Sequence, residues 1–311
     1  MLRRFAGPAL AAALLLLMQP LGAQTDQIIH VGASSFEANA GVYYALDNGF
    51  FKQVGINVEA QPYNNGAAIA AAVAGGTLQI GCANPLPVAV AHERGLNFVI
   101  IAPGTLHDTK IDPPNFMIAP NSTIRSGKDF NGLTIGVTAL SGLDPLGALG
   151  WIDKHGGDSR TVKLVELPHT LMADAVNDGR VAAALMADPA RAAGLAAGKV
   201  RSFADSYESI GNRFFVSSWF ANRDWADKNA DLVRRFRIAI DRAGDWATRN
   251  PEPAALILKK YMSITEARAH EEHARSIDPS FVQQIIDAAV KYKYLDHAMD
   301  ARDIIWTGPR A

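Results

Sequence analysis

Cysteine is almost absent from this 311-residue chain, in which Cys82 is the single example. One cysteine cannot form an internal disulfide, so the fold must be stabilised by its core alone. A catalytic thiol would need a partner such as histidine to stabilise the thiolate. Cys82 lies instead within an apolar stretch, residues 78–83, which favours a buried small side chain.

An excess of charge of either sign is also absent. The chain has 30 Lys and Arg against 31 Asp and Glu, for a net charge of −1. Because no basic excess is available to pair with a phosphate backbone, we expect no nucleic-acid partner. The composition, 49% hydrophobic and 20% charged, is that of a globular protein. The length is sufficient for two domains of roughly 100–150 residues.

Motifs of the common catalytic and metal sites are missing too. There is no GxSxG, Walker or GxGxxG pattern. The HEEH run at residues 270–273 places its histidines three positions apart, whereas a zinc protease motif needs four. That spacing favours a solvated helix face. The sequence therefore predicts no catalytic residue, no metal and no cofactor.

The first 23 residues have the order of a secretory signal peptide. Arg3 and Arg4 precede an apolar run at residues 9–18, and Pro-Leu-Gly-Ala offers a cleavage site after Ala23. The apolar run is too short for a comfortable membrane span. No cysteine lies directly after this run, where a lipid anchor would be attached, so we expect export to the periplasm without a lipid anchor.

Short strand patterns alternate with helical patterns from residue 28 onward. This alternation predicts an α/β fold whose sheets are largely parallel. A Pro-containing link after residue 105 separates two such series. From residue 224 the pattern is helical. The strands are expected at residues 28–34, 56–63, 78–83 and 97–104, then at 116–120, 133–140, 161–167 and 183–187, with a return strand near 213–225.

Two helices are predicted to begin close together, at Asn65-Gly66 and Asn84-Pro85. Asn is a good N-cap, and Pro suits a first helical position. Each start follows a strand, and ligands of such sheets bind at the carboxyl ends of the strands. Small residues there let backbone N–H groups approach an anion closely. Good capping alone explains the same residues, so both interpretations stay open.

Four segments resemble, in sequence and in order, the sulfonate, taurine, nitrate and thiamine-pyrimidine-precursor group of solute-binding proteins. The longest is AGVYYALDNGFFKQVGINVEAQPYNNGAAIAAAVAGGTLQIG, and SGKDFNGLTIGV resembles the start of the second domain in that group. ADLVRRFRIAIDRAGDWATRNPEPAA and IDAAVKYKYL resemble C-terminal helices. The resemblance covers nearly the whole mature chain and does not specify the ligand.

This resemblance implies a class II periplasmic-binding-protein fold with a ligand cleft between two α/β lobes. Lobe one would comprise residues 24–112 and 215–311, and lobe two residues 113–214. Two crossover segments, near residues 103–113 and 214–219, would form the hinge. Such a protein is a monomer that closes on a small molecule and delivers it to the permease and ATPase of an ABC importer.

The family's binding loops, carried over position by position, give a set of expected ligand contacts. Hydroxyls, amides and backbone N–H groups suit an oxyanion, and aromatic rings can line an apolar body or simply pack in the core. The expected contacts are Ser34, Ser35, Phe36, Tyr63, Asn64, Asn65, Gly66, Asn84, Pro85, Thr105, Ser141, Gly142, Leu143, Asp188, Phe215 and Trp219.

Most of these loops carry no Arg or Lys, which favours a singly charged sulfonate or carboxylate over a dianion. Asp188 could pair with a ligand ammonium, as in a taurine-like compound, or simply begin a helix. Two alternatives to an importer subunit remain. One is a binding module for a sensor or receptor. The other is an enzyme like the thiamine-pyrimidine synthases, which resemble this fold but carry a cysteine-rich motif that this chain lacks.

Overall fold

The computed structural model describes residues 27–112, 114–262 and 272–309. The expected signal peptide, residues 1–23, lies outside the described residues. In the part of the chain that is described, no helix combines the length and the apolar character that a membrane span requires.

Lobe one contains the N-terminal and C-terminal parts of the described chain. Its elements are β1 (Ile28–Ser34), η1 (Glu37–Asn39), α1 (Gly41–Asp47), α2 (Phe50–Gln53), β2 (Asn57–Tyr63), α3 (Gly66–Ala74), β3 (Ile80–Ala83), α4 (Pro85–Glu93), β4 (Phe98–Pro103), β12 (Ser218–Asn222), α8 (Arg223–Lys228), α9 (Ala230–Arg249), α10 (Pro251–Met262), α11 (Pro279–Lys291) and η5 (Ala301–Ile304). Its sheet has the order β2-β1-β3-β12-β4. β1 is parallel to β2 and β3, whereas β12 is antiparallel to its neighbours β3 and β4.

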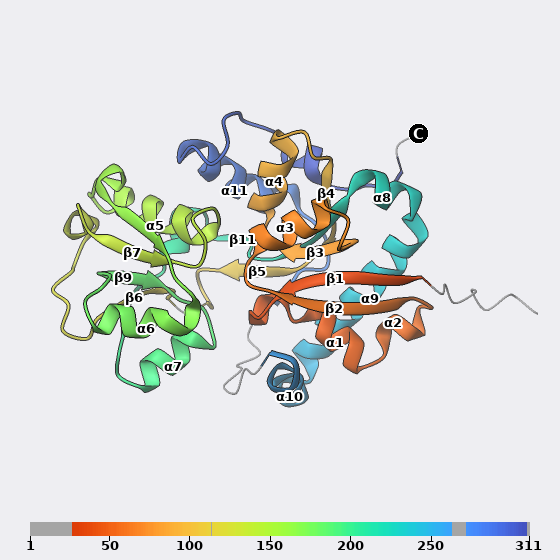
Figure 1. Cartoon of the computed structure of the whole chain (residues 1–311), viewed down its shortest axis with the longest axis horizontal. Helices are drawn as coiled ribbons and strands as arrows, with labels where there is room; N and C mark the ends of the chain where they lie inside the picture. The colour runs from red at the N-terminus through yellow and green to blue at the C-terminus, as the bar shows by residue number, and fades with distance from the viewer. Residues whose placement is uncertain (1–26, 113, 263–271, 310–311) are drawn as a thin grey trace, which may run out of the picture.

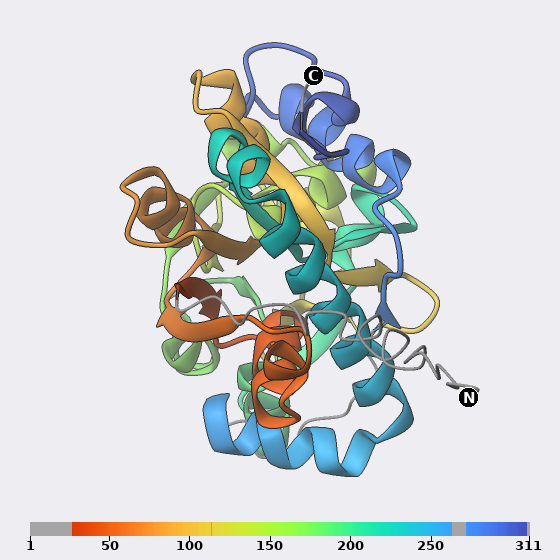
Figure 2. The ribbon, with the colours of Figure 1, turned by 90° about the vertical axis from the view of Figure 1, so that its right-hand side faces the viewer.

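Helices cover both faces of this sheet. The long helix α9 lies against one face beside α1 and α2, with α10 below it (Figure 2). Helices α3, α4 and α11 contribute to the core on the other face. Adjacent residues of β12 belong to different hydrophobic cores. Trp219 packs in the core on the α9 side, the first core, and Phe220 packs in the core on the side of α3, α4 and α11, the second core.

Lobe two is formed by the middle of the chain and lies beside lobe one (Figure 1). Its elements are β6 (Phe116–Ile118), η2 (Gly127–Phe130), β7 (Thr134–Val137), α5 (Leu143–Lys154), η3 (Ser159–Thr161), β8 (Lys163–Glu166), α6 (His169–Asn177), β9 (Ala183–Leu185), α7 (Ala190–Ala196), β10 (Arg201–Ala204) and η4 (Ser206–Ser209). Its sheet has the order β10-β6-β9-β7-β8. β7 is parallel to β8 and β9, and β6 is antiparallel to β9 and β10.

A third, three-stranded sheet joins the lobes. It consists of β11 (Arg213–Phe215), β5 (Thr105–Asp108) and β13 (Glu272–His273), all paired antiparallel. The outgoing crossover β5 and the returning crossover β11 therefore lie side by side. Our interpretation of HEEH as a helix face is wrong for Glu272 and His273, which form β13, and residues 270 and 271 are not described.

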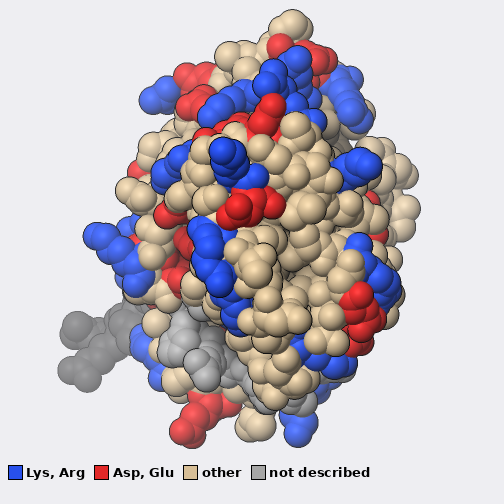
Figure 3. All heavy atoms as spheres, turned by 90° about the vertical axis from the view of Figure 1, so that its left-hand side faces the viewer, with Lys and Arg blue, Asp and Glu red and all other residues tan. Residues whose placement is uncertain are grey.

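The lobes also pack directly against one another beside this sheet. Leu143 and Leu146 of α5 share a hydrophobic core with Val282 and Ile285 of α11. The face of the molecule shown in Figure 3 carries Lys and Arg interspersed with Asp and Glu, in keeping with a net charge near zero.

Candidate functional site

The two lobes enclose a cavity of about 640 Å³. Its walls come from the segments that follow β1, β2 and β3 in lobe one and β7, β8 and β9 in lobe two. These are the carboxyl ends of the strands, where ligands of open α/β sheets bind. The polar residues that line the cavity are Ser34, Glu37, Asn39, Asn65, Asn84, His107, Asp112, Asn115, Thr138, Ser141, Asp144, His169, Asp188, Arg191, Ser202 and Tyr207.

Two asparagines of lobe one cap helices at the cavity, as the sequence predicts. Asn65 Oδ1 accepts a hydrogen bond from Ala68 N at 3.0 Å, and Asn84 Oδ1 accepts one from Leu86 N at 3.1 Å. Each cap engages the amide oxygen. The Nδ2 end of each side chain is not needed for the cap and is suited to donate to a ligand acceptor.

The loop after β1 is fixed by a buried chain of hydrogen bonds. Asn39 Nδ2 donates to Ser34 Oγ at 2.5 Å, and Cys82 Sγ donates to Asn39 Oδ1 at 3.1 Å. Cys82 is fully buried, which confirms its predicted place in the core. The thiol therefore supports the loop after β1 from the core side and does not line the cavity.

The loop after β7 forms the facing wall in lobe two. Asp144 accepts hydrogen bonds from Thr138 Oγ1 at 2.6 Å and from Tyr207 OH at 2.8 Å. Burial and the Asp144 carboxylate hold the pKa of Tyr207 well above its usual value, so its hydroxyl stays protonated. The Asp144 carboxylate is thus engaged within the protein.

One aromatic contact crosses the cavity. The Phe36 ring of lobe one lies 4.5 Å from the His169 ring of lobe two, centroid to centroid, in an edge-to-face arrangement. Burial lowers the pKa of His169, and Asp144 opposes this effect, so the imidazole is favoured in its neutral form. A neutral imidazole and a phenyl ring together offer an apolar surface to the body of a ligand.

The cavity contains a carboxylate that the protein does not fully satisfy. Asp188 is engaged, because Arg191 donates to it through Nε and Nη2. Glu37 faces this pair from lobe one, and its buried Oε1 accepts no hydrogen bond. Burial raises the pKa of Glu37 to about 7, with Asp188 as the second cause and Arg191 acting in the opposite direction.

His107 of β5 lies where the crossovers meet. Its Nδ1 lies 2.8 Å from Asp112 Oδ2 and its Nε2 lies 3.1 Å from Asp205 Oδ2. Burial disfavours the imidazolium, but the hydrogen bonds to both carboxylates outweigh it and raise the pKa of His107 to about 9. A protonated His107 therefore joins the outgoing crossover to Asp205 of lobe two at neutral pH.

Nine of the sixteen expected ligand contacts line this cavity. They come from five of the expected loops, three in lobe one and two in lobe two. The nine are Ser34, Phe36, Asn65, Gly66, Asn84, Ser141, Gly142, Leu143 and Asp188.

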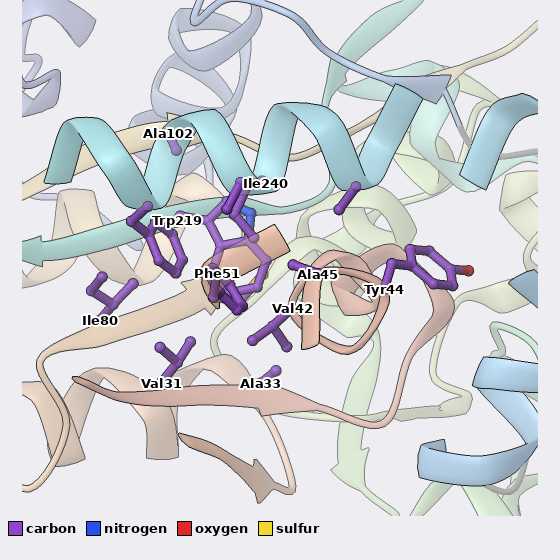
Figure 4. Packing of buried hydrophobic residues seen from close by; sticks show 14 of the residues in the cluster. Val31, Ala33, Val42, Tyr44, Ala45, Phe51, Ile80, Ala102, Trp219 and Ile240 are labelled. Atoms are coloured by element: carbon purple, nitrogen blue, oxygen red, sulfur yellow. The ribbon is translucent and has the colours of Figure 1, made fainter. Parts of the chain in front are cut away.

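The other expected contacts do not line it, for reasons of packing. Trp219 lies beneath α9 with Phe51 and Ile240, because both faces of its strand are covered by helices (Figure 4). Phe215 is fully buried in the second core. Thr105 is buried, and its Oγ1 donates to Ala38 O at 3.0 Å, behind the cleft loop.

The remaining four expected contacts border the cavity loops without lining it. Pro85 is buried within the first turn of α4, and Tyr63 ends β2 against the second core. Ser35 and Asn64 are neighbours of residues that do line the cavity.

Sequence reasoning missed most of the charged lining. Glu37, His107, Asp112, Asp144, His169 and Arg191 all belong to it. Arg191 carried a usable signal, since it lies in the first turn of the helix that begins directly after Asp188-Pro189. Glu37 and Asp144 directly follow the expected contacts Phe36 and Leu143, whereas His107, Asp112 and His169 are brought to the cavity by long-range packing.

Solved structures of similar fold have low sequence identity to this chain. The periplasmic aliphatic sulphonate-binding protein SsuA from Escherichia coli is 19% identical, with a TM-score of 0.74, over 91% of this chain and 98% of that one. The periplasmic nitrate-binding protein NrtA from Synechocystis PCC 6803 is 12% identical, with a TM-score of 0.71, over 93% and 86%. The desulfurization enzyme DSZB is 13% identical, with a TM-score of 0.63, over 89% and 96%.

These similarities confirm the expected fold, two α/β lobes of the periplasmic-binding-protein type. No curated protein sequence matches the chain significantly. The sequence model of the family described as NMT1/THI5 like matches residues 37–254 of the 311. Because this match spans well over half of its length, the chain belongs to the NMT1/THI5-like family.

Proposed function

We propose that this protein is the periplasmic solute-binding subunit of an ABC importer. The observation that carries the proposal is the cavity of about 640 Å³ between the lobes, lined from both of them at the carboxyl ends of their strands. A volume of this size suits a small organic molecule. The fold is shared with the sulphonate-binding protein SsuA and the nitrate-binding protein NrtA.

The starts of α3 and α4 support an anionic group on the solute. Both helices point their N-termini at the cavity, and Asn65 and Asn84 stand at these ends. Exposed N–H groups and the helix dipole together favour a sulfonate or carboxylate there. Phe36 and His169 would then cover the apolar body of the same molecule.

Closure of the lobes on the solute is part of the proposal. The expected hinge consists of the segments around β5 and β11, and the protein is expected to act as a monomer whose closed form docks on the permease. Small-angle scattering should therefore show one monomer with a smaller radius of gyration when solute is added. An unchanged radius with a proven solute would count against a hinge mechanism.

The partner separates the importer from a sensor or receptor module, because both would use the same cavity. The exported protein is cross-linked to the membranes of the cells that produce it and is then captured by affinity. This capture should recover a permease and an ATPase. Recovery of a receptor in their place would favour the sensor module.

An enzyme on this scaffold is the less favoured candidate. DSZB shows that the fold can carry catalysis. Of the cavity groups, Asp144 and Asp188 are engaged by neighbouring side chains, and Cys82 is buried outside the cavity. Incubation with the bound solute followed by mass analysis tests this candidate, and we expect the solute to be recovered unchanged.

A further inference from the structure

Glu37 is an unusual residue to find in a cavity proposed to bind an anion. Its side chain is only 8% exposed, and its Oε1 has no hydrogen-bond partner. A buried acceptor without a partner costs free energy, and the cost is larger for a charged group. Glu37 belongs to η1 in the loop after β1, and it is one of the residues that line the cavity from lobe one.

The surroundings of Glu37 do not neutralise it. Asp188 faces it across the cavity and makes ionisation harder, and Arg191 opposes that effect. Arg191 already makes a two-point contact with Asp188 and donates to Pro114 O at 3.4 Å. An additional positive charge beside Glu37 and Asp188 is therefore favoured.

We propose that Glu37 is a ligand contact whose Oε1 accepts a hydrogen bond from a positively charged nitrogen group of the solute. This inference rests on the proposed function, since it assumes that the solute occupies the same cavity. Together with the anion position at α3 and α4, it describes a solute that carries a basic nitrogen as well as an anionic group. Glu37 thus selects against solutes that carry the anionic group alone.

The first experiment compares matched probes on the full exported chain by calorimetry. Three pairs isolate the nitrogen: taurine with propane-1-sulfonate, β-alanine with butanoate, and benzamidine with benzamide. We expect the charged member of at least one pair to bind about 10- to 100-fold more tightly than its partner. Glu37→Gln, which keeps the shape and removes the charge, should abolish that preference. Glu166→Gln, at an exposed position in β8, is the control that should retain it.

The same probes test the linkage to protons. Because burial and Asp188 raise the pKa of Glu37 to about 7, a cation competes with a proton there. Benzamidine stays charged between pH 5.5 and 8, so its affinity should rise by roughly 30-fold over that range and stay level in Glu37→Gln. Other charged or titratable groups line a neighbouring pocket together with Glu37, and any pH dependence that they cause would be the same in the wild type and in Glu37→Gln. These groups are Asp245, Arg249, Glu272, His273 and Arg275.

The outcomes separate this inference from the proposed function. Mass spectrometry of solute that co-purifies with the protein provides the independent arm. A co-purified solute that lacks a basic nitrogen, or equal affinity for both members of every pair, would overturn the role of Glu37 and leave a solute-binding protein. A preference that survives in Glu37→Gln would overturn it as well. The absence of both co-purified solute and probe binding would contradict the proposed function itself.

Discussion

His107 Nε2 lies 3.1 Å from Asp205 Oδ2, and this contact joins the outgoing crossover to lobe two. His107 belongs to the outgoing strand β5, and Asp205 is the N-cap of η4 in lobe two, shortly before the returning strand β11. The imidazole is also enclosed by the rings of Tyr207 and Phe214, with centroids 5.3 and 5.2 Å away. One ionised side chain thus stabilises the region proposed as the hinge.

His107 should make the stability of the protein depend on pH in a defined window. Its pKa is raised from 6.5 to about 9, so its contribution is fully present below pH 6.5 and is lost as the pH rises through 9. We expect the unfolding free energy to fall by an amount on the order of 1–3 kcal/mol between these values. Denaturant melts of His107→Gln should lack this slope. His297→Gln, at an exposed position, should retain it.

A wild-type unfolding free energy that stays constant between pH 6.5 and 9 would contradict the charged His107.

Glu37 affects stability in a different pH window, because its pKa is raised from 4.5 to about 7. The ionised carboxylate is the less stable form in the folded protein, so its effect is a loss of stability as the pH rises from 4.5 to 7. The two contributions can therefore be separated by pH.

Asn84 distinguishes a ligand contact from a helix cap. Asn84→Leu removes both the cap oxygen and the Nδ2 donor, whereas Asn84→Ser keeps an oxygen able to accept from Leu86 N. If Nδ2 donates to the solute, both variants should lose about one to two decades of affinity for the co-purified solute. The cap is worth about 1 kcal/mol, so Asn84→Leu should also melt earlier. Unchanged affinity in both variants would mean that Asn84 acts only as a cap.

Asp188 should control the charge that Arg191 presents to the cavity. Asp188→Asn preserves the shape and the oxygen that accepts from Ala192 N, but it removes the carboxylate that pairs with Arg191. Propane-1-sulfonate should then bind about tenfold more tightly, since the cavity carries one negative charge fewer. Titration calorimetry measures this directly. Weaker binding of propane-1-sulfonate would indicate that the ion pair serves to position the loop.

Two glycines at the cavity should respond differently to the same substitution. A Cβ added at Gly66 would lie 2.9 Å from Ala83 Cβ, so Gly66→Ala should destabilise the fold by about 1 kcal/mol or more. A Cβ at Gly142 would meet no atom within 4 Å. Gly142→Ala should therefore leave the melting temperature nearly unchanged while it occupies space in the cavity. Equal losses of stability in the two variants would contradict this assignment.

Local sequence signals predicted the elements well because each is short and punctuated. The helix at residues 66–74 begins at its Asn cap and ends before Gly75-Gly76, where the structure has α3. The strand at residues 28–34 is β1. β5, β10 and β13 were not predicted, and the return strand expected near 213–225 is two strands, β11 and β12, followed by the start of α8. The two residues of β13 have no periodic pattern and form a strand only by pairing with β5.

The site was predicted only in part because the cavity is built from distant segments. Caps and loops that follow strands could be found locally, and they include Asn65 and Asn84. Trp219 was expected at the ligand because it lies on the return strand. Its direction depends on the alternation within β12 and on α9, which covers that face of the sheet. The role proposed for Glu37 depends on Asp188 of lobe two, which lies opposite it in the folded protein.

Native mass spectrometry of the exported protein tests the central claim, that one small solute binds in the cavity between the lobes. The comparison is with Gly142→Trp, because no atom lies within 4 Å of the position of a Cβ at Gly142, so a large side chain there should take up space in the cavity. We expect an added mass of one small organic molecule on the wild-type chain and none on the variant. The ligand-free forms of the two proteins should have similar melting temperatures. An added mass of the same size on both proteins, or on neither, would contradict the central claim.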